Sequence, residues 1–204
     1  WDVPAGDWTI LRFGRVITGH TTRPAPEPGL GFESDKFDAA AIEVHLSAYA
    51  AKLLDFVEPL GYRKSGLTTL HFDSWEMSSQ NWSEKFRADF QRLRGYDPLP
   101  FLPAMTGLIV DGGETSERFL WDLRRTAQEL VVANHIVPLV EFCRRRGLKF
   151  SIEPYDMNPA GALALGGPAV IKEGRVDPEL MIQMGAKAYR DRIPRYRDTL
   201  RRLD

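Results

Sequence analysis

Apolar residues recur every three to four positions along three stretches of this chain, and this spacing predicts three amphipathic helices. The stretches cover residues 34–58, 83–94 and 116–146. Ser34 is placed to cap the first helix, and Gly95 is placed to end the second. Pro138 is expected to kink the third helix, because proline removes a backbone hydrogen-bond donor from the helical ladder.

Short apolar runs rich in β-branched and aromatic residues separate these helices and predict strands. The runs fall within residues 1–22 and at 67–72 and 148–152, and the Pro- and Gly-rich stretch 96–113 is expected to be a long loop. Helices long enough to cross over between strands imply a parallel sheet. The order of elements therefore predicts an α/β fold that is part of a (β/α) barrel of the TIM type. A doubly wound open sheet stays possible, although no Gly-rich phosphate loop accompanies it.

The 204 residues divide by pattern into three parts. Residues 1–32 are expected to form a β-rich entry segment and loop, 33–167 a partial barrel catalytic domain, and 168–204 a basic helical tail of unclear origin. A complete barrel of this type takes about 250 residues. We therefore expect the chain to be a fragment of a larger enzyme, whose remaining domains would be its partners.

Composition removes several classes of function. The 27 basic and 28 acidic residues give a net charge of -1, so no nucleic-acid partner is expected. No apolar run reaches about 18 residues, so no membrane span is expected. Cys143 is the one cysteine, which rules out an internal disulfide and a Cys-based zinc site. The four histidines show no metal-ligand spacing, and those within the predicted helices are interpreted as packing or surface residues.

Carboxylates follow two of the predicted strands directly. Asp73 and Glu76 follow the strand at 67–72, and Glu153 and Asp156 follow the strand at 148–152. The carboxyl ends of barrel strands build the active site. Glycoside hydrolysis needs two carboxyl groups, one to protonate the leaving oxygen and one to activate water or attack the sugar. The pattern predicts a glycosidase, and the candidate catalytic residues are Glu153, Glu76 and Asp73.

Glu153 is the sharpest of these candidates, because Pro154 ends the strand and should leave the carboxyl at its rim. Nearby side chains are candidates for substrate binding, since aromatic rings stack on sugars, although core packing is the commoner role of any one ring. These candidates are Trp75, Asn81, Trp82, Tyr155 and Asp156. The acids offer hard oxygen ligands, so calcium or no metal is expected in place of zinc.

A series of short motifs follows in order along the chain: Trp1-Asp2-Val3-Pro4-Ala5-Gly6-Asp7-Trp8, Glu33-Ser34-Asp35-Lys36, Asp73-Ser74-Trp75-Glu76, Asn81-Trp82, Arg94-Gly95-Tyr96-Asp97, Glu117-Arg118-Phe119-Leu120-Trp121-Asp122 and Glu153-Pro154-Tyr155-Asp156. Together they resemble glycoside hydrolase family 106, the α-L-rhamnosidases, over about residues 1–167. After Gly167 the sequence departs from the family pattern.

The resemblance implies a large enzyme with a barrel catalytic domain, β-sandwich accessory domains and an inverting mechanism that uses two glutamates. It implies that Glu153 is the general acid and that the second glutamate lies further along a full-length chain. It also implies calcium in some members and a secreted or periplasmic location. The substrate expected is a terminal α-L-rhamnoside of a plant or microbial polysaccharide.

Two other functions stay open at this point. The chain as it stands could be a non-catalytic or decayed barrel fragment, because a second catalytic carboxylate has not been found in it. It could also belong to an unrelated barrel glycosidase that cleaves β-linked sugars. A carboxyl separation of about 5 Å would favour that reading, because inverting enzymes hold the two groups about 6.5–9.5 Å apart.

Overall fold

A computed structural model describes residues 2–22, 25–60, 66–73, 80–152, 171–172 and 175–176 of the chain. The chain groups into two compact units. The first combines residues 1–19 with 82–126, and the second combines 20–81 with 127–204. Over the described ranges, no helix is both long enough and apolar enough to cross a membrane. Of the basic helical tail predicted over 168–204, they include only residues 171–172 and 175–176.

The first unit contains α4 (Phe86–Arg94), the 3-10 helix η3 (Leu99–Thr106) and the first part of α5 (Gly113–Val131). Gly95 ends α4 with a left-handed φ of 82°, which confirms the stop predicted for it. The structure differs from the predicted loop at 96–113, because η3 lies inside it. Proline near the start of η3 presets a helical φ where its missing N–H costs nothing.

Aromatic side chains form the core of the first unit. Phe86 and Phe90 from α4 and Phe119 from α5 are almost completely buried. The Phe90 ring meets that of Tyr96 edge to face with centroids 5.0 Å apart, an arrangement that the ring quadrupoles favour. The Tyr96 hydroxyl donates to Asp122 Oδ2 over 3.0 Å, and burial followed by this bond raises the pKa of Tyr96 above its ordinary value.

The strands predicted within residues 1–22 are not formed in the structure. Residues 2–19 contain neither helix nor strand, and Ile10, Val16 and Ile17 in this segment are more than 70% exposed. The β-type contact found here is an isolated bridge between Thr21 and Phe32. The apolar spacing was correct for a strand, but a strand forms only where another backbone pairs with it.

In the second unit, the first predicted helix is confirmed as α1 (Ala39–His45), the π-helical turn η1 (Leu46–Ala50), α2 (Ala51–Val57) and the 3-10 turn η2 (Glu58–Leu60). Its start differs from the prediction. Asp38, and not Ser34, caps the helix by accepting a hydrogen bond from Ala40 N. Ile42, Leu46, Ala50 and Leu54 form its buried ridge, four residues apart.

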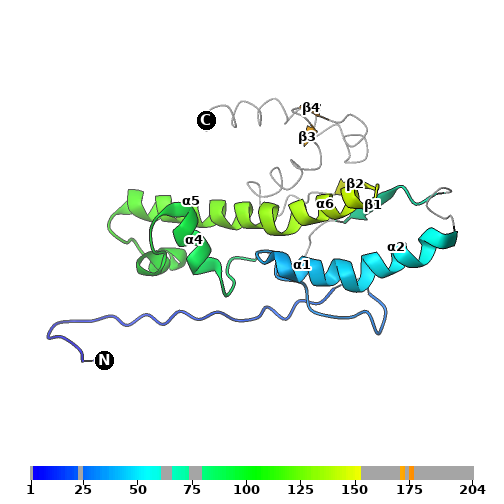
Figure 1. The fold of residues 1–204 in the computed structure, drawn as a ribbon. Coiled ribbons are helices and arrows are strands. Elements are labelled where there is room, and N and C mark those ends of the chain that lie inside the picture. The colour runs from blue at the N-terminus through cyan, green and yellow to red at the C-terminus, as the bar shows by residue number, and fades with distance from the viewer. Residues whose placement is uncertain are drawn as a thin grey trace. The chain divides into compact units, whose positions relative to one another are not determined.

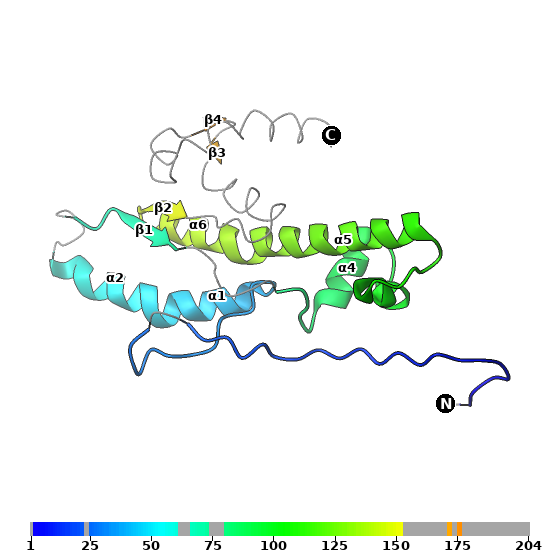
Figure 2. The ribbon, with the colours of Figure 1, turned by 180° about the vertical axis from the view of Figure 1, so that it is seen from behind.

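The third predicted helix is confirmed as α5, the π-helical turn η4 (Val132–Ile136) and α6 (Val137–Arg145). Pro138 was expected to kink this helix, and the irregularity falls just before it, in η4. Pro138 lies in the first turn of α6, which continues directly from η4, so its missing N–H interrupts the regular hydrogen-bond ladder next to the π-helical turn. Figures 1 and 2 show α6 beside the strands β1 (Thr69–Phe72) and β2 (Lys149–Ile152) in both views.

β1 and β2 pair in parallel, as the sequence predicts for strands joined by helices. The register matches Thr69 with Lys149 and Phe72 with Ile152. A second, antiparallel pair joins β3 (Ile171–Lys172) to β4 (Arg175–Val176). The fold is therefore helix-rich and mixed, with a small parallel sheet.

Candidate active site

The strands β1 and β2, which precede the candidate acids in the sequence, end at the same edge of the sheet. Phe72 and Ile152 are the last residues of β1 and β2, and they are partners in the parallel register. Asp73 follows Phe72 directly, and its side chain is 81% exposed. The remaining predicted residues at this edge lie outside the described residues: Glu76, Glu153, Trp75, Tyr155 and Asp156. The chain therefore leaves both strands at one edge of the sheet.

One residue before this edge, two side chains join the strands. His71 Nδ1 lies 3.1 Å from the Ser151 hydroxyl oxygen, across the β1–β2 pair. The other ring nitrogen, Nε2, lies 4.0 Å from an Asp73 carboxylate oxygen. Ser151 is buried, whereas the His71 side chain is half exposed.

Residues 33–38, which we call the entry turn, form a partly buried polar cluster in the second unit that the sequence did not single out as a site. Lys36 is only 4% exposed, and its ammonium pairs with Glu33 Oε2 over 2.7 Å. Asp35 Oδ1 accepts a hydrogen bond from Phe37 N over 2.9 Å, which closes the turn. The cluster uses charged groups that are rarely buried unless they are paired.

Gln80 binds the entry turn from 45 residues further along the chain. Its Oε1 accepts a hydrogen bond from Lys36 N over 3.0 Å, and its Nε2 donates to Asp35 Oδ1 over 2.6 Å. The two partners fix the orientation of the amide, because a backbone N–H can only donate and a carboxylate can only accept.

The π-helical turn η4 joins the entry turn to the end of β1. Asn134 Nδ2 donates to the Phe37 carbonyl oxygen over 2.6 Å. The His135 ring meets Phe72 edge to face, with centroids 5.4 Å apart. His135 is 3% exposed, and neither of its ring nitrogens has a hydrogen-bond partner in the described part of the chain. Burial, then the nearby charges of Lys36 and His45, lower the pKa of His135 to about 3, so its imidazole is neutral near pH 7.

The other two predicted substrate-binding residues lie just after Gln80. Asn81 is exposed. Trp82 is half-buried, and its indole packs against the buried Phe86 ring with centroids 4.8 Å apart. The Trp82 ring therefore contributes to the core of the first unit, whatever further contact it makes.

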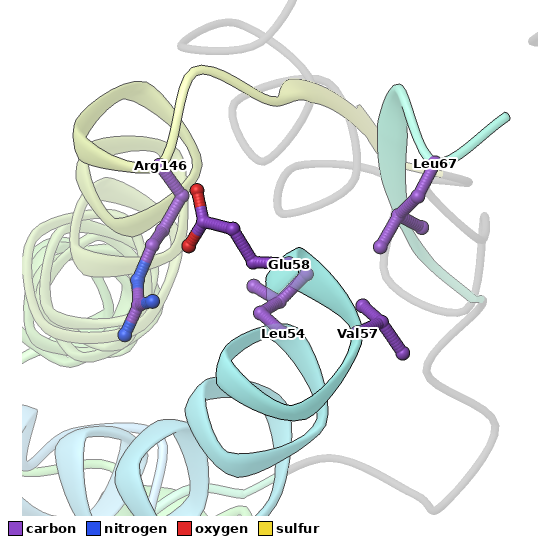
Figure 3. Close-up of a pocket in the computed structure, with 5 residues that line it drawn as sticks. All are labelled: Leu54, Val57, Glu58, Leu67 and Arg146. Carbon is purple, nitrogen blue, oxygen red and sulfur yellow. The ribbon is translucent and has the colours of Figure 1, made fainter. Parts of the chain in front are cut away.

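A small pocket in the second unit lies at the opposite end of the strands from the acids. Figure 3 shows its lining by Leu54, Val57 and Glu58 from the end of the first helix, with Leu67 and Arg146 from the residues that precede β1 and β2. Arg146 also pairs with the Asp55 carboxylate and lies over the Phe142 ring. Asp73 follows β1 and does not line this pocket.

Neither a metal nor a thiolate site is built by the described residues. In these ranges no three His, Cys, Asp or Glu side chains lie close enough to hold a metal ion. Of the four acids that offer hard oxygen ligands in the sequence, only Asp73 lies within these ranges. Cys143 is buried, and burial raises the pKa of its thiol to about 11, which disfavours the reactive thiolate.

This chain is similar to a known protein family, to a protein of known sequence and to a solved structure. Residues 1–165 match the family model of glycoside hydrolase family 106, alpha-L-rhamnosidase. The chain is 40% identical over 157 residues to a protein of Formosa agariphila named "Putative beta-glucuronidase", covering 76% of this chain and 13% of that protein.

The structure of this chain is similar to that of a rhamnosidase from Novosphingobium sp. PP1Y, with a TM-score of 0.58 and a sequence identity of 39%. The match covers 65% of this chain and 13% of the rhamnosidase chain. The chain thus spans only about an eighth of the length of these relatives. The match to the family covers most of this sequence, including both of its acid-bearing segments. The chain belongs to glycoside hydrolase family 106, the α-L-rhamnosidase family.

Proposed function

We propose that the polypeptide containing this chain is an inverting α-L-rhamnosidase that releases terminal rhamnose from plant or microbial polysaccharides. The observation that carries the proposal is the common edge at which β1 and β2 end, with candidate acids directly following both strands. Membership of the family and the similarity to a solved rhamnosidase support the choice of sugar.

We propose that β1 and β2 are two strands of a (β/α) barrel. In this proposal residues 33–167 belong to the catalytic barrel, 1–32 are an entry segment, and 168–204 are a basic tail that is helical after β4. Active sites of such barrels lie at the carboxyl ends of the strands. The acids that follow Phe72 and Ile152 then lie on the catalytic face, and the remaining barrel strands come from the rest of the polypeptide.

Glu153 is the proposed general acid, with Glu76 as the next candidate and Asp73 as a supporting carboxylate. The general acid protonates the glycosidic oxygen as the bond to the anomeric carbon breaks. A second carboxylate removes a proton from the water that attacks the opposite face of the sugar. That base is proposed to lie outside this chain. Sugar binding is assigned to residues that lie close to these acids in the sequence: Trp75, Asn81, Trp82, Tyr155 and Asp156.

A β-glucuronidase is the second candidate function, because the Formosa agariphila relative carries that name. The two substrates differ in charge, since a glucuronide has a carboxylate and a rhamnoside has none. A glucuronidase site therefore needs a cation placed to pair with that carboxylate. Among the described residues near the edge, Lys36 is a buried cation, and it already pairs with Glu33.

The test is hydrolysis by the full-length polypeptide of aryl α-L-rhamnosides, aryl β-D-glucuronides and rhamnose-bearing oligosaccharides. Release of rhamnose with no release of glucuronic acid is the expected result. Turnover of glucuronides alone overturns the assignment in favour of the second candidate. Failure to cleave any glycoside supports the reading of a non-catalytic or decayed barrel fragment.

Three further properties are proposed from the family resemblance. Calcium is proposed to assist catalysis at the sugar, with ligands that are not assigned. The partners are proposed to be a carbohydrate substrate and the remaining domains of a larger polypeptide, with no nucleic acid or membrane. A secreted or periplasmic location is proposed, since polysaccharide substrates lie outside the cell.

A further inference from the structure

The small parallel sheet of β1 and β2 has two chemically different faces. Partners in the register lie on the same face, and successive residues of one strand lie on opposite faces. Phe72 and Ile152 are partners on the apolar face, where the Phe72 ring packs on His135 of η4. His71 and Ser151 are partners one position earlier, so they lie on the opposite face. That face therefore carries two polar side chains close to the ends of the strands.

The barrel of the proposed function assigns an inside and an outside to these faces. Helices surround the sheet of such a barrel, so the face on which a helix packs is the outer one. The Phe72 ring contacts η4, and α6, which follows η4, lies beside both strands (Figures 1 and 2). His71 and Ser151 then belong to the inner face, one residue before the edge at which a barrel holds its substrate.

Ser151 fixes the orientation of the His71 ring. Its side chain is buried, with the residue 5% exposed, and a buried hydroxyl costs free energy unless it is hydrogen-bonded. His71 Nδ1 lies 3.1 Å from the Ser151 oxygen. An Asp73 carboxylate oxygen lies 4.0 Å from the other ring nitrogen, Nε2, and its negative charge favours the tautomer with the proton on Nε2. In this tautomer the Ser151 hydroxyl donates to Nδ1.

The distance between His71 Nε2 and Asp73 suits a bridging hydroxyl. At 4.0 Å the two groups are too far apart for a hydrogen bond, and polar groups at such distances are often bridged by an intervening oxygen. A hydroxyl can accept from the Nε2–H and donate to the carboxylate at the same time. Both side chains are accessible, since that of His71 is 54% exposed and that of Asp73 81% exposed.

We propose that His71 and Asp73 together bind one ring hydroxyl of the terminal sugar, and that Ser151 is a positioning residue that orients the imidazole. The hydroxyl accepts a hydrogen bond from His71 Nε2 and donates one to the Asp73 carboxylate. This proposal rests on the proposed function, and it adds His71 and Ser151 to the residues that act on the substrate. A sugar without that hydroxyl leaves the Nε2–H and the carboxylate without this partner.

The experiment measures kcat/KM of the full-length polypeptide on an aryl α-L-rhamnoside and on its analogues that lack the 2-, 3- or 4-hydroxyl. His71→Ala should lower kcat/KM on the complete rhamnoside by about 10-fold, the size of one hydrogen bond. On one of the three analogues the same variant should lose less than about 2-fold, because the bond is already missing there. Ser151→Ala should show the same dependence on that hydroxyl with a smaller loss of about 3-fold.

The comparison between substrates separates sugar binding from a purely structural role of His71. A partly unfolded variant lowers kcat/KM by the same factor on all four rhamnosides, so unfolding does not imitate the expected pattern. His45→Ala, at an exposed histidine of α1, is the matched control and should match the wild type on every substrate. An equal loss on all four rhamnosides in His71→Ala overturns the hydroxyl-binding role.

Failure of the proposed function is a different result. A wild type that cleaves no rhamnoside refutes the proposed function, and the site is then tested by calorimetric binding of free L-rhamnose. His71→Ala should weaken this binding by about 10-fold. Equal binding by the wild type and His71→Ala, or no binding by the wild type, overturns the site.

Discussion

His135 provides a measurable link between folding and pH. Its imidazole is 3% exposed, and burial with the nearby charges of Lys36 and His45 lowers its pKa to about 3. In the unfolded chain the pKa of a histidine is about 6.5. Below that pH, His135 binds a proton in the unfolded state but stays unprotonated in the folded state. The stability contributed by a neutral His135 is therefore fully present above about pH 6.5 and is lost as pH falls toward 3.

The magnitude follows from the two pKa values. Between pH 7 and pH 5 the wild type should lose about 2 kcal/mol of unfolding free energy through this one group, because proton uptake by the unfolded state contributes about 1.4 kcal/mol per pH unit. The loss hardly depends on the folded-state pKa, provided that this pKa lies well below 5. Carboxylates titrate mostly near pH 4, below this pH range. His135 therefore makes the main contribution to the change in unfolding free energy between pH 7 and pH 5.

The assay is urea unfolding of the chain at several pH values between 7 and 5, with His135→Leu compared with the wild type. The leucine side chain has no group that binds a proton, so the unfolding free energy of this variant should be almost constant over this pH range. His45→Gln, at an exposed histidine of α1, is the control and should keep the slope of the wild type. An equal slope in His135→Leu and the wild type would refute the argument that His135 is buried in its neutral form.

The remaining predictions concern the proposed chemistry and the start of the first helix. Glu153→Gln in the full-length polypeptide should lower turnover of an unactivated rhamnoside by about 10²–10⁴-fold. The effect on an activated aryl rhamnoside should be smaller, since that leaving group needs little protonation. Near-normal turnover of the unactivated rhamnoside would make Glu76 the next candidate for the general acid. Asp38→Ala should destabilise the chain by about 1 kcal/mol in urea unfolding, whereas Ser34→Ala should change little, because Asp38 holds the cap. Exhaustive chelation should lower rhamnosidase activity, and added calcium should restore it; activity that survives chelation would argue against a catalytic calcium.

The helices and the two central strands were predictable because their signals are local. The buried ridge Ile42, Leu46, Ala50 and Leu54 is a helical spacing visible in the sequence, and the runs at 67–72 and 148–152 are recovered as β1 and β2. The predicted strands within 1–22 failed because pairing depends on another backbone, which local sequence does not contain. Ser34 does not cap the first helix, because the residues after it form a turn that Asp35 closes. The helix therefore begins later, at Ala39, with Asp38 as its cap.

The place of Asp73 was visible for the same reason, since it follows the apolar run at 67–72 directly. The places of Glu76, Glu153 and Asp156 stay predictions. The motif Glu33-Ser34-Asp35-Lys36 is visible in the sequence, but the contacts of the entry turn could not be inferred from the sequence. Gln80 lies 45 residues from Asp35, and Asn134 lies 97 residues from Phe37, so only the folded chain brings them together. His135 was interpreted as a packing or surface residue. It is buried, but its polar ring and its contact with Phe72 place it beside the candidate site.

The pairing of β1 with β2 also limits which carboxylates can work together. Neighbouring strands lie about 4.8 Å apart, so acids that directly follow two in-register neighbours start from closely spaced backbones. Side chains on such closely spaced backbones can bring their carboxyls to the separation of about 5 Å found in retaining enzymes, whereas inverting enzymes need about 6.5–9.5 Å for the attacking water. If Glu153 is the acid of an inverting enzyme, its base should therefore come from a strand that is not the neighbour β1. Proton NMR of the first-formed sugar tests this: inverted rhamnose is expected, and retained rhamnose would make Asp73 or Glu76 the partner of Glu153.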